Sequence, residues 1–138
     1  MAMGKGSGSK QPSAFVMTRD LAESPGHPFY EKLNKVLRAE GFDAFAEAQC
    51  APYYADKLGR PSIPPGVYFR MLMVGYFEGI DSERGIDWRV SDSLALRRFL
   101  GYGLDESTPD HSSLSRTRYR LPYAVHEEVF NWVLRLLA

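Results

Sequence analysis

The chain has few of the features that mark secreted or membrane proteins. It contains a single cysteine, Cys50, which excludes an internal disulfide and fits a reducing cytosol, where we expect this side chain to be a small apolar part of the interior. No stretch approaches about 18 uninterrupted apolar residues, which excludes a transmembrane helix. Residues 1–13 are rich in Gly, Ser and Lys but lack a hydrophobic segment, so they do not form a secretory signal peptide. We therefore expect a cytoplasmic protein.

The chain also lacks an excess of either charge. Lys and Arg total 17, Asp and Glu total 17, and the formal net charge is zero. This balance argues against strong nonspecific binding of nucleic acid, because domains dedicated to that task are usually basic. The balance changes locally, however. From Arg84 to Arg120 there are seven arginines against five acids, and three of these arginines lie within the last five residues.

No segment alternates apolar and polar residues with the period of a β-strand, and no internal repeat is present. Apolar residues recur instead with helical spacing, so the sequence predicts an all-α fold of about six or seven helices. A length of 138 residues fits one domain with a real core. We expect residues 1–26 to form a flexible N-terminal tail and arm, and residues 27–138 to form the helical domain.

The predicted helices are separated by Gly, Pro and capping residues. They cover residues 29–41, 43–49, 67–76, 82–91, 92–100, 110–121 and 123–137. The helix at 67–76 is apolar on most sides, which predicts a position at the centre of the domain. Residues 50–65 hold four prolines and are predicted as a loop with fixed bends. Trp88, at helical spacing from Arg84, is predicted as a core residue, and a stacking platform is its alternative role.

Three of these helices, at 82–91, 92–100 and 110–121, are short and consecutive. This is the layout of a helix-turn-helix-like trihelical unit, in which the last helix enters the major groove of DNA. The connection between the second and third helices is longer than the turn of the minimal motif, so the match is partial. The sequence nevertheless predicts such a unit in the C-terminal part of the domain.

The last helix of this unit has a nearly all-polar outer face. Thr108 is its candidate N-terminal cap, and at about 100° per residue Leu114, Thr117 and Leu121 point inward. Arginine pairs bidentately with phosphate or guanine, and serine hydroxyls reach phosphate oxygens. The alternative is a solvated face whose arginines pair with nearby acids. The candidate DNA-contacting residues are His111, Ser112, Ser113, Arg116, Tyr119 and Arg120.

Other arginines have different predicted roles. Arg97 and Arg98 are candidates for contact with backbone phosphates, since the first helices of such units cross the DNA backbone. Arg118 lies nearer the core flank of its helix, so an ion pair with a nearby acid is its alternative role. His111 is a candidate for either a DNA contact or a cap on a neighbouring carbonyl.

The sequence carries no pattern of a catalytic or metal site. The three histidines have no Cys or acid at ligand spacing, which argues against zinc. Asp81, Glu83 and Asp87 stand at a predicted helix start, where acids stabilise the helix dipole. Ser112 and Ser113 lack the strand and glycines of a hydrolase nucleophile elbow. We therefore expect no enzymatic activity, no cofactor and no metal.

Several segments resemble a known family when taken in order. They are RPSIPP at 60–65, MLMVGY at 71–76, SERGI at 82–86, LALRRFLG at 94–101 and TPDHSSLSR at 108–116. Together they resemble the N-terminal domain of insertion-sequence transposases of the InsH type, over roughly residues 30–121. The resemblance implies a bacterial domain that binds double-stranded DNA at the terminal inverted repeats of the element during transposition.

In such transposases this domain precedes a ribonuclease-H-like domain with an Asp-Asp-Glu metal triad. The chain ends at Ala138, where the resemblance places the start of that catalytic domain. The expectation is therefore a transposase truncated before its catalytic domain, a split transposase or an excerpt of one, without a triad of its own.

A second interpretation is a protein-interaction module. The neutral net charge and the apolar helix at 67–76 also suit a dimerisation domain, or an inhibitory truncated transposase that associates with the full-length protein. Its partner is then a second copy of the chain or the full-length transposase. Salt separates the two interpretations, because DNA binding falls steeply with salt and apolar association does not.

Overall fold

The computed structural model describes residues 3–4, 28–54 and 62–138. These residues fold into helices and contain no strand, which confirms the all-α prediction. The helices are α1 (Pro28–Ala39), α2 (Phe42–Cys50), the short 3₁₀ helix η2 (Ala51–Tyr53), α3 (Pro65–Glu78), α4 (Glu83–Ser91), α5 (Leu94–Leu100), α6 (His111–Arg120) and α7 (Tyr123–Leu137). The predicted tail and arm lie outside the described residues, apart from residues 3–4.

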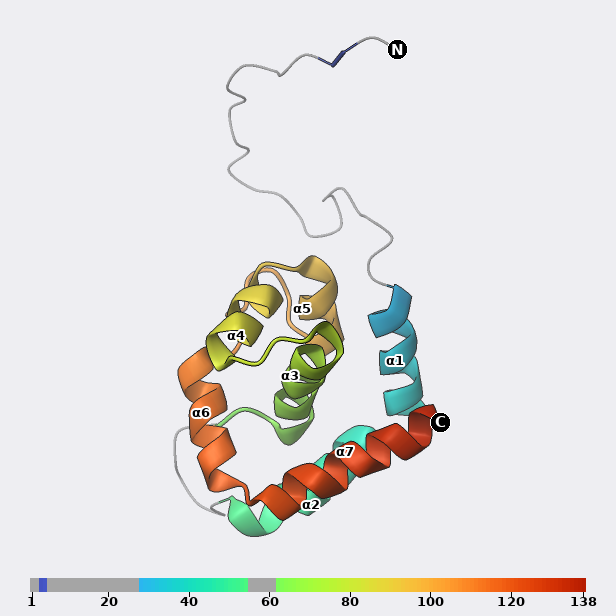
Figure 1. The fold of residues 1–138 in the computed structure, drawn as a ribbon, viewed down its shortest axis with the longest axis vertical. Helices are drawn as coiled ribbons and strands as arrows, with labels where there is room; N and C mark the ends of the chain where they lie inside the picture. The colour runs from blue at the N-terminus through green and yellow to red at the C-terminus, as the bar shows by residue number, and fades with distance from the viewer. Residues whose placement is uncertain (1–2, 5–27, 55–61) are drawn as a thin grey trace.

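Helix α3 lies in the middle of the domain, with α1, α6 and the pair α2 and α7 around it (Figure 1). It packs against α2, α4 and α5, and Tyr68, Phe69 and Met71 are fully buried. The prediction of a central helix at this place is therefore confirmed. Its end is set by Gly79, whose φ of 69° favours glycine and whose N–H donates to the carbonyl of Gly75. Within the described ranges, no helix has the length and apolar composition needed to cross a bilayer.

Helices α4, α5 and α6 form the predicted sequence of three short helices. Helix α4 packs against both α5 and α6, and also against α3. The contact with α3 is close at Gly75, where an added Cβ would lie 2.8 Å from Cδ1 of Ile86. Serine caps begin two of the three helices: Ser82 accepts from the N–H of Gly85, and Ser93 accepts from the N–H of Leu96.

The predicted cap of α6 is wrong by two residues. The helix begins at His111, and the carboxylate of Asp110 accepts from the N–H of Ser113 at 2.8 Å. Asp110 has the extended backbone of an N-cap residue, so Thr108 lies too far from the first free N–H groups to serve them. A carboxylate at this position also interacts favourably with the helix dipole.

Replacement of Asp110 by alanine should lower the free energy of unfolding by about 0.5–2 kcal/mol, because the Ser113 N–H loses its acceptor. Asp110→Asn should retain most of the stability, since an amide oxygen accepts the same bond. Denaturant titration of the two variants measures the difference. Equal stability of the alanine and asparagine variants would contradict the cap.

The prediction for Trp88 is also wrong, because its side chain is 66% exposed. Ile86 and Val90 supply the buried face of α4, and Trp88 falls on the opposite side of this short helix. Arg84 shares the exposed side with Trp88, one turn earlier. The helical spacing of the two residues is thus real, but it describes the surface of the domain and not its core.

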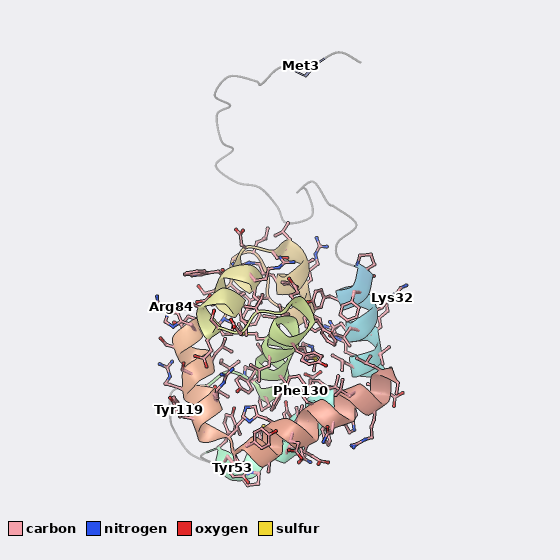
Figure 2. The ribbon with its side chains drawn as sticks, viewed as in Figure 1. Met3, Lys32, Tyr53, Arg84, Tyr119 and Phe130 are labelled. Atoms are coloured by element: carbon pink, nitrogen blue, oxygen red, sulfur yellow. The ribbon has the colours of Figure 1, made fainter. Side chains whose placement is uncertain are left out.

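Helix α7 covers the domain along one side and has the predicted bounds. Trp132 stacks on Phe45 of α2, with ring centroids 4.8 Å apart. Phe130 faces α3, where its ring lies 6.1 Å from that of Tyr76 (Figure 2). The buried residues of α7 are Val125, Val129 and Val133. Cys50, at the end of α2, is fully buried, as expected.

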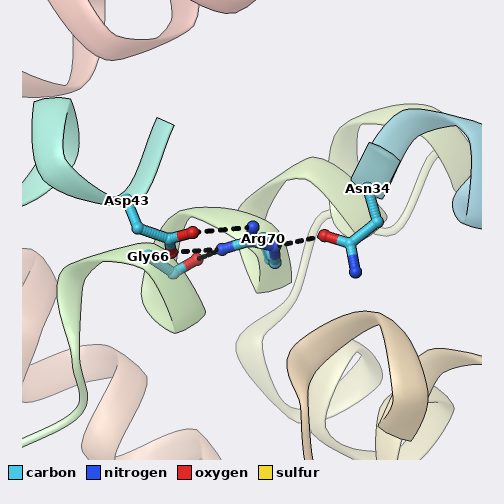
Figure 3. Close-up of polar contacts among 4 residues, drawn as sticks. All are labelled: Asn34, Asp43, Gly66 and Arg70. Atoms are coloured by element: carbon cyan, nitrogen blue, oxygen red, sulfur yellow. Dashed lines mark hydrogen bonds and ion pairs between the residues drawn. The ribbon is translucent and has the colours of Figure 1, made fainter. Parts of the chain in front are cut away.

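A buried arginine joins three helices in the core (Figure 3). The side chain of Arg70 on α3 is 5% exposed, and its guanidinium pairs with both carboxylate oxygens of Asp43 on α2, at 2.7 and 3.1 Å. It also donates to the side chain of Asn34 on α1 and to the carbonyl of Gly66. The ring of Phe42 lies 5.3 Å from the guanidinium carbon. This arrangement satisfies the buried charge on all sides.

A second polar pair, which is partly buried, joins α3 to α7. The hydroxyl of Tyr68 lies 2.7 Å from Nε2 of His126, and Nδ1 of His126 lies 3.1 Å from the carbonyl of Pro122. Since a carbonyl only accepts, Nδ1 carries the proton of the neutral ring and Nε2 accepts from the tyrosine. Burial raises the pKa of Tyr68 to about 12 and lowers the pKa of His126.

The lowered pKa of His126 predicts a loss of stability in mild acid. The unfolded chain binds a proton near the ordinary histidine pKa of about 6.5, whereas the folded chain resists protonation. The contribution of the neutral ring is therefore complete above about pH 6.5 and is lost as the pH falls toward the lowered pKa of the folded state. Unfolding titrations at about pH 7.5 and about pH 5.5 should show this loss, and His126→Gln should reduce it. An unchanged pH dependence in that variant would contradict the assignment.

Candidate nucleic-acid interface

Helix α6 buries one side and exposes the other. Leu114, Thr117 and Leu121 are buried, as the spacing predicts. The buried hydroxyl of Thr117 donates to the carbonyl of Ser113 at 2.9 Å, so it needs no partner from another helix. The inner side thus fixes the rotation of α6 about its axis and leaves the arginines on the outer side.

Helix α4 holds α6 in place through two acids. The carboxylate of Glu83 accepts from the hydroxyl of Ser115 and pairs with Arg118 at 3.2 Å. One turn further along α4, Asp87 accepts from the backbone N–H of His111 at 3.1 Å. The prediction that Arg118 bridges to an acid is confirmed. These contacts join α6 to α4 at the start of α6 and in its second half, so the exposed side of α6 has a fixed orientation relative to α4.

The exposed side of α6 carries two arginines and a tyrosine. Arg116 is exposed and donates to the hydroxyl of Ser113 at 3.2 Å. Tyr119 is 91% exposed and lies at the edge of the molecule, as does Arg84 of α4 (Figure 2). Arg120 is exposed, and its guanidinium carbon lies 4.9 Å from the ring centroid of Tyr54. Both arginines therefore present charge to solvent in defined positions.

The remaining candidates on α6 lie at its first turn. His111, Ser112 and Ser113 are half-buried. Two carboxylates stand at this end, those of Asp87 and Asp110, and the hydrogen bond from the Ser113 N–H holds the pKa of Asp110 below its usual range. This end of α6 is therefore negative, and its second half is positive. A phosphate group is favoured along the second half, near Arg116 and Arg120.

The two arginines of α5 have different surroundings. Arg97 donates to the backbone carbonyls of Ser91, Gly103 and Glu106, at 3.0, 3.2 and 2.8 Å. Its guanidinium thereby ties α5 to the turn that leads toward α6, and it acts as a positioning residue. Arg98 is exposed. Contact of either arginine with a phosphate stays a prediction.

The exposed surface around α6 extends to residues on the neighbouring helices. Arg84 and Trp88 extend the exposed surface onto α4, and Tyr123, at the start of α7, is 79% exposed. The signal for the first two is their spacing of four residues on the side opposite Ile86 and Val90. Among the described residues, no three His, Cys, Asp or Glu side chains gather as metal ligands.

Comparison with known proteins identifies a family. Residues 17–120 match the protein family described as "Transposase domain (DUF772)", which covers most of the chain, including α4, α5 and α6. Comparison with curated proteins and with solved structures gave no match.

Proposed function

This chain belongs to the transposase domain (DUF772) family, and on that premise we propose that it is a DNA-binding domain that recognises the terminal inverted repeats of an insertion sequence. Its partner is double-stranded DNA at the ends of the element, in the bacterial cytoplasm. The domain acts by binding and not by catalysis, and the cutting and joining of DNA belong to a ribonuclease-H-like domain of the kind that InsH-type transposases carry.

One observation carries this proposal: α6 is held against α4 by hydrogen bonds and an ion pair, and its outer side is polar and cationic. Glu83 and Asp87 fix α6 against α4, and Arg116, Tyr119 and Arg120 are exposed. A helix of this kind fits the major groove, where arginine reads guanine edges or pairs with phosphates. In this proposal α6 is the recognition helix, and α4 and α5 support it as a helix-turn-helix-like unit.

The neutral charge of the whole chain fits a binding mode that depends on position and not on bulk attraction. Acids at the start of α6 disfavour phosphate there, whereas the arginines of its second half favour it. DNA is therefore expected to be held in one register relative to α6. Specific binding then exceeds nonspecific binding even though the formal net charge is zero.

The test is a binding titration with two duplexes at two salt concentrations. One duplex carries the inverted repeats that flank the gene, and the other has the same bases in scrambled order. At about 50 mM salt the first duplex should bind more tightly than the second. Both affinities should be lower at about 200 mM salt, and the logarithm of the binding constant should fall with the logarithm of the salt concentration by about 0.9 per phosphate contact. Equal binding of the two duplexes would contradict the proposal. Self-association that survives high salt, with no DNA preference, would favour a dimerisation or inhibitory module instead.

A further inference from the structure

Tyrosines and arginines gather where α6 ends and α7 begins. Tyr119 lies in the last turn of α6 and is 91% exposed, and Tyr123 opens α7 and is 79% exposed. The short helix η2 lies beside this junction (Figure 1), as the contact between Arg120 and Tyr54 shows. We call the residues Tyr119, Tyr123, Arg116 and Arg120 the Tyr–Arg corner.

The two tyrosine rings of the corner do not pack into the hydrophobic core. Within the part of the chain that the structure describes, neither Tyr119 nor Tyr123 has an aromatic ring partner or a hydrogen bond from its side chain. Tyr68, by contrast, is fully buried and bonded to His126. Two large rings left in water beside two arginines are a typical composition of a surface that binds a partner.

The chemistry of the corner suits a nucleic-acid strand. Arg116 and Arg120 form no ion pair with an acid among the described residues, so both are available to phosphates. Arg118, which lies between them in sequence, is neutralised by Glu83. Aromatic rings next to such cations stack on bases, and this stacking accepts any base, because every base has a π-face.

The position of Tyr123 distinguishes a paired from an unpaired strand. A duplex that lies along α6 contacts the residues of that helix, whereas Tyr123 follows Pro122 at the start of a different helix. Paired bases also keep their faces inside the stack, where a tyrosine ring cannot reach them. Bases that have left the duplex present their faces and can extend beyond the end of α6.

We propose that the Tyr–Arg corner binds unpaired nucleotides next to the duplex held by α6, with bases stacked on Tyr119 and Tyr123 and phosphates paired with Arg116 and Arg120. This inference rests on the proposed function, because it takes the adjoining duplex to lie along α6. It assigns the domain a ligand beyond double-stranded DNA: a duplex end with a short single-stranded extension.

The test compares two probes of the same sequence by fluorescence anisotropy: the blunt inverted-repeat duplex, and the same duplex with a few unpaired nucleotides at one end. The intact chain should bind the frayed probe about tenfold more tightly. The double variant Tyr119→Ala, Tyr123→Ala should bind the two probes with equal affinity, because the unpaired bases lose the rings on which they stack. Since both side chains are exposed, this variant should fold normally, which circular dichroism checks.

Two control variants make the test specific. Replacing both tyrosines by phenylalanine should keep the preference for the frayed probe, because the rings still stack. Tyr76→Ala removes a tyrosine that is 62% exposed on α3 and should leave both affinities unchanged. Equal binding of the two probes by the intact chain, or loss of the preference in the phenylalanine variant, would overturn the proposal. Tighter binding of the blunt inverted-repeat duplex than of the scrambled duplex, with no gain from fraying, overturns only this inference. Equal binding of the inverted-repeat and scrambled duplexes overturns the proposed function as well.

Discussion

Replacement of Arg70 by alanine is expected to lower the free energy of unfolding by about 3 kcal/mol, the lower end of the range measured when one partner of a buried ion pair is removed, because the side chain of Asp43 is half exposed. The loss has several sources. The side chain of Arg70 is 5% exposed and pairs with Asp43, and it also satisfies the side chain of Asn34 and the carbonyl of Gly66. Alanine leaves these acceptors without a donor and removes the contact with the ring of Phe42.

The measurement is denaturant unfolding followed by circular dichroism, with two further variants for comparison. Asp43→Asn should cost less than Arg70→Ala, since the side chain of Asp43 is 51% exposed and the amide still accepts from the guanidinium. Arg84→Ala is the matched control, because this arginine is exposed, and its stability should change by less than about 0.5 kcal/mol. A loss below about 1 kcal/mol in Arg70→Ala would show that the buried arginine is not central to the fold.

Replacement of Arg116 by alanine is expected to weaken binding of the inverted-repeat duplex by about 1–3 kcal/mol if the side chain reads a base. This corresponds to about a 5- to 150-fold loss of affinity. The physical reason is the bidentate pairing of a guanidinium with a guanine edge, which alanine cannot make. Because Arg116 is exposed and donates only to the side chain of Ser113 among the described residues, the fold should be unaffected.

Two comparisons separate base reading from phosphate contact. Arg116→Lys keeps the charge but loses the planar fork, so it should restore binding only if Arg116 touches a phosphate. In that case the alanine variant loses affinity equally for the cognate and the scrambled duplex. The matched control is Arg135→Ala, at an exposed position on α7 away from α6, which should not change binding. Unchanged affinity of Arg116→Ala for the cognate duplex would contradict the assignment of α6.

Much of the fold follows from local sequence signals. The bounds of α7 are those predicted, because its apolar spacing is regular, and the starts of α4 and α5 are marked by Ser82 and Ser93. Local signals were less decisive at the start of α6. There Thr108 and Asp110 are both capping residues, and only the backbone conformation shows that the carboxylate of Asp110 reaches the Ser113 N–H.

Features that depend on contacts between distant residues could not be predicted. Arg70 reads as a polar interruption of an apolar helix, since its partners Asp43 and Asn34 lie 27 and 36 residues away. The helical spacing of Trp88 from Arg84 does not show which side of α4 faces the core, and the buried side is the one that carries Ile86 and Val90.

The candidate interface was predictable in part. The exposure of Arg116, Tyr119 and Arg120 and the burial of Leu114 follow from the period of a helix. The fixation of α6 by Glu83 and Asp87 depends on how α4 and α6 pack, which periodicity does not give. The place of Tyr123 beside the end of α6 also depends on how α6 and α7 are joined, which the period of either helix does not give.

The most direct test of the central claim is backbone amide NMR of the chain during titration with the inverted-repeat duplex. If α6 is the recognition helix, the largest shift changes fall in residues 112–120 and in the neighbouring part of α4, and the scrambled duplex produces weaker changes at the same amides. Changes concentrated instead on α3 and α7, around Tyr76 and Phe130, would contradict the claim and place the binding surface on another side of the domain.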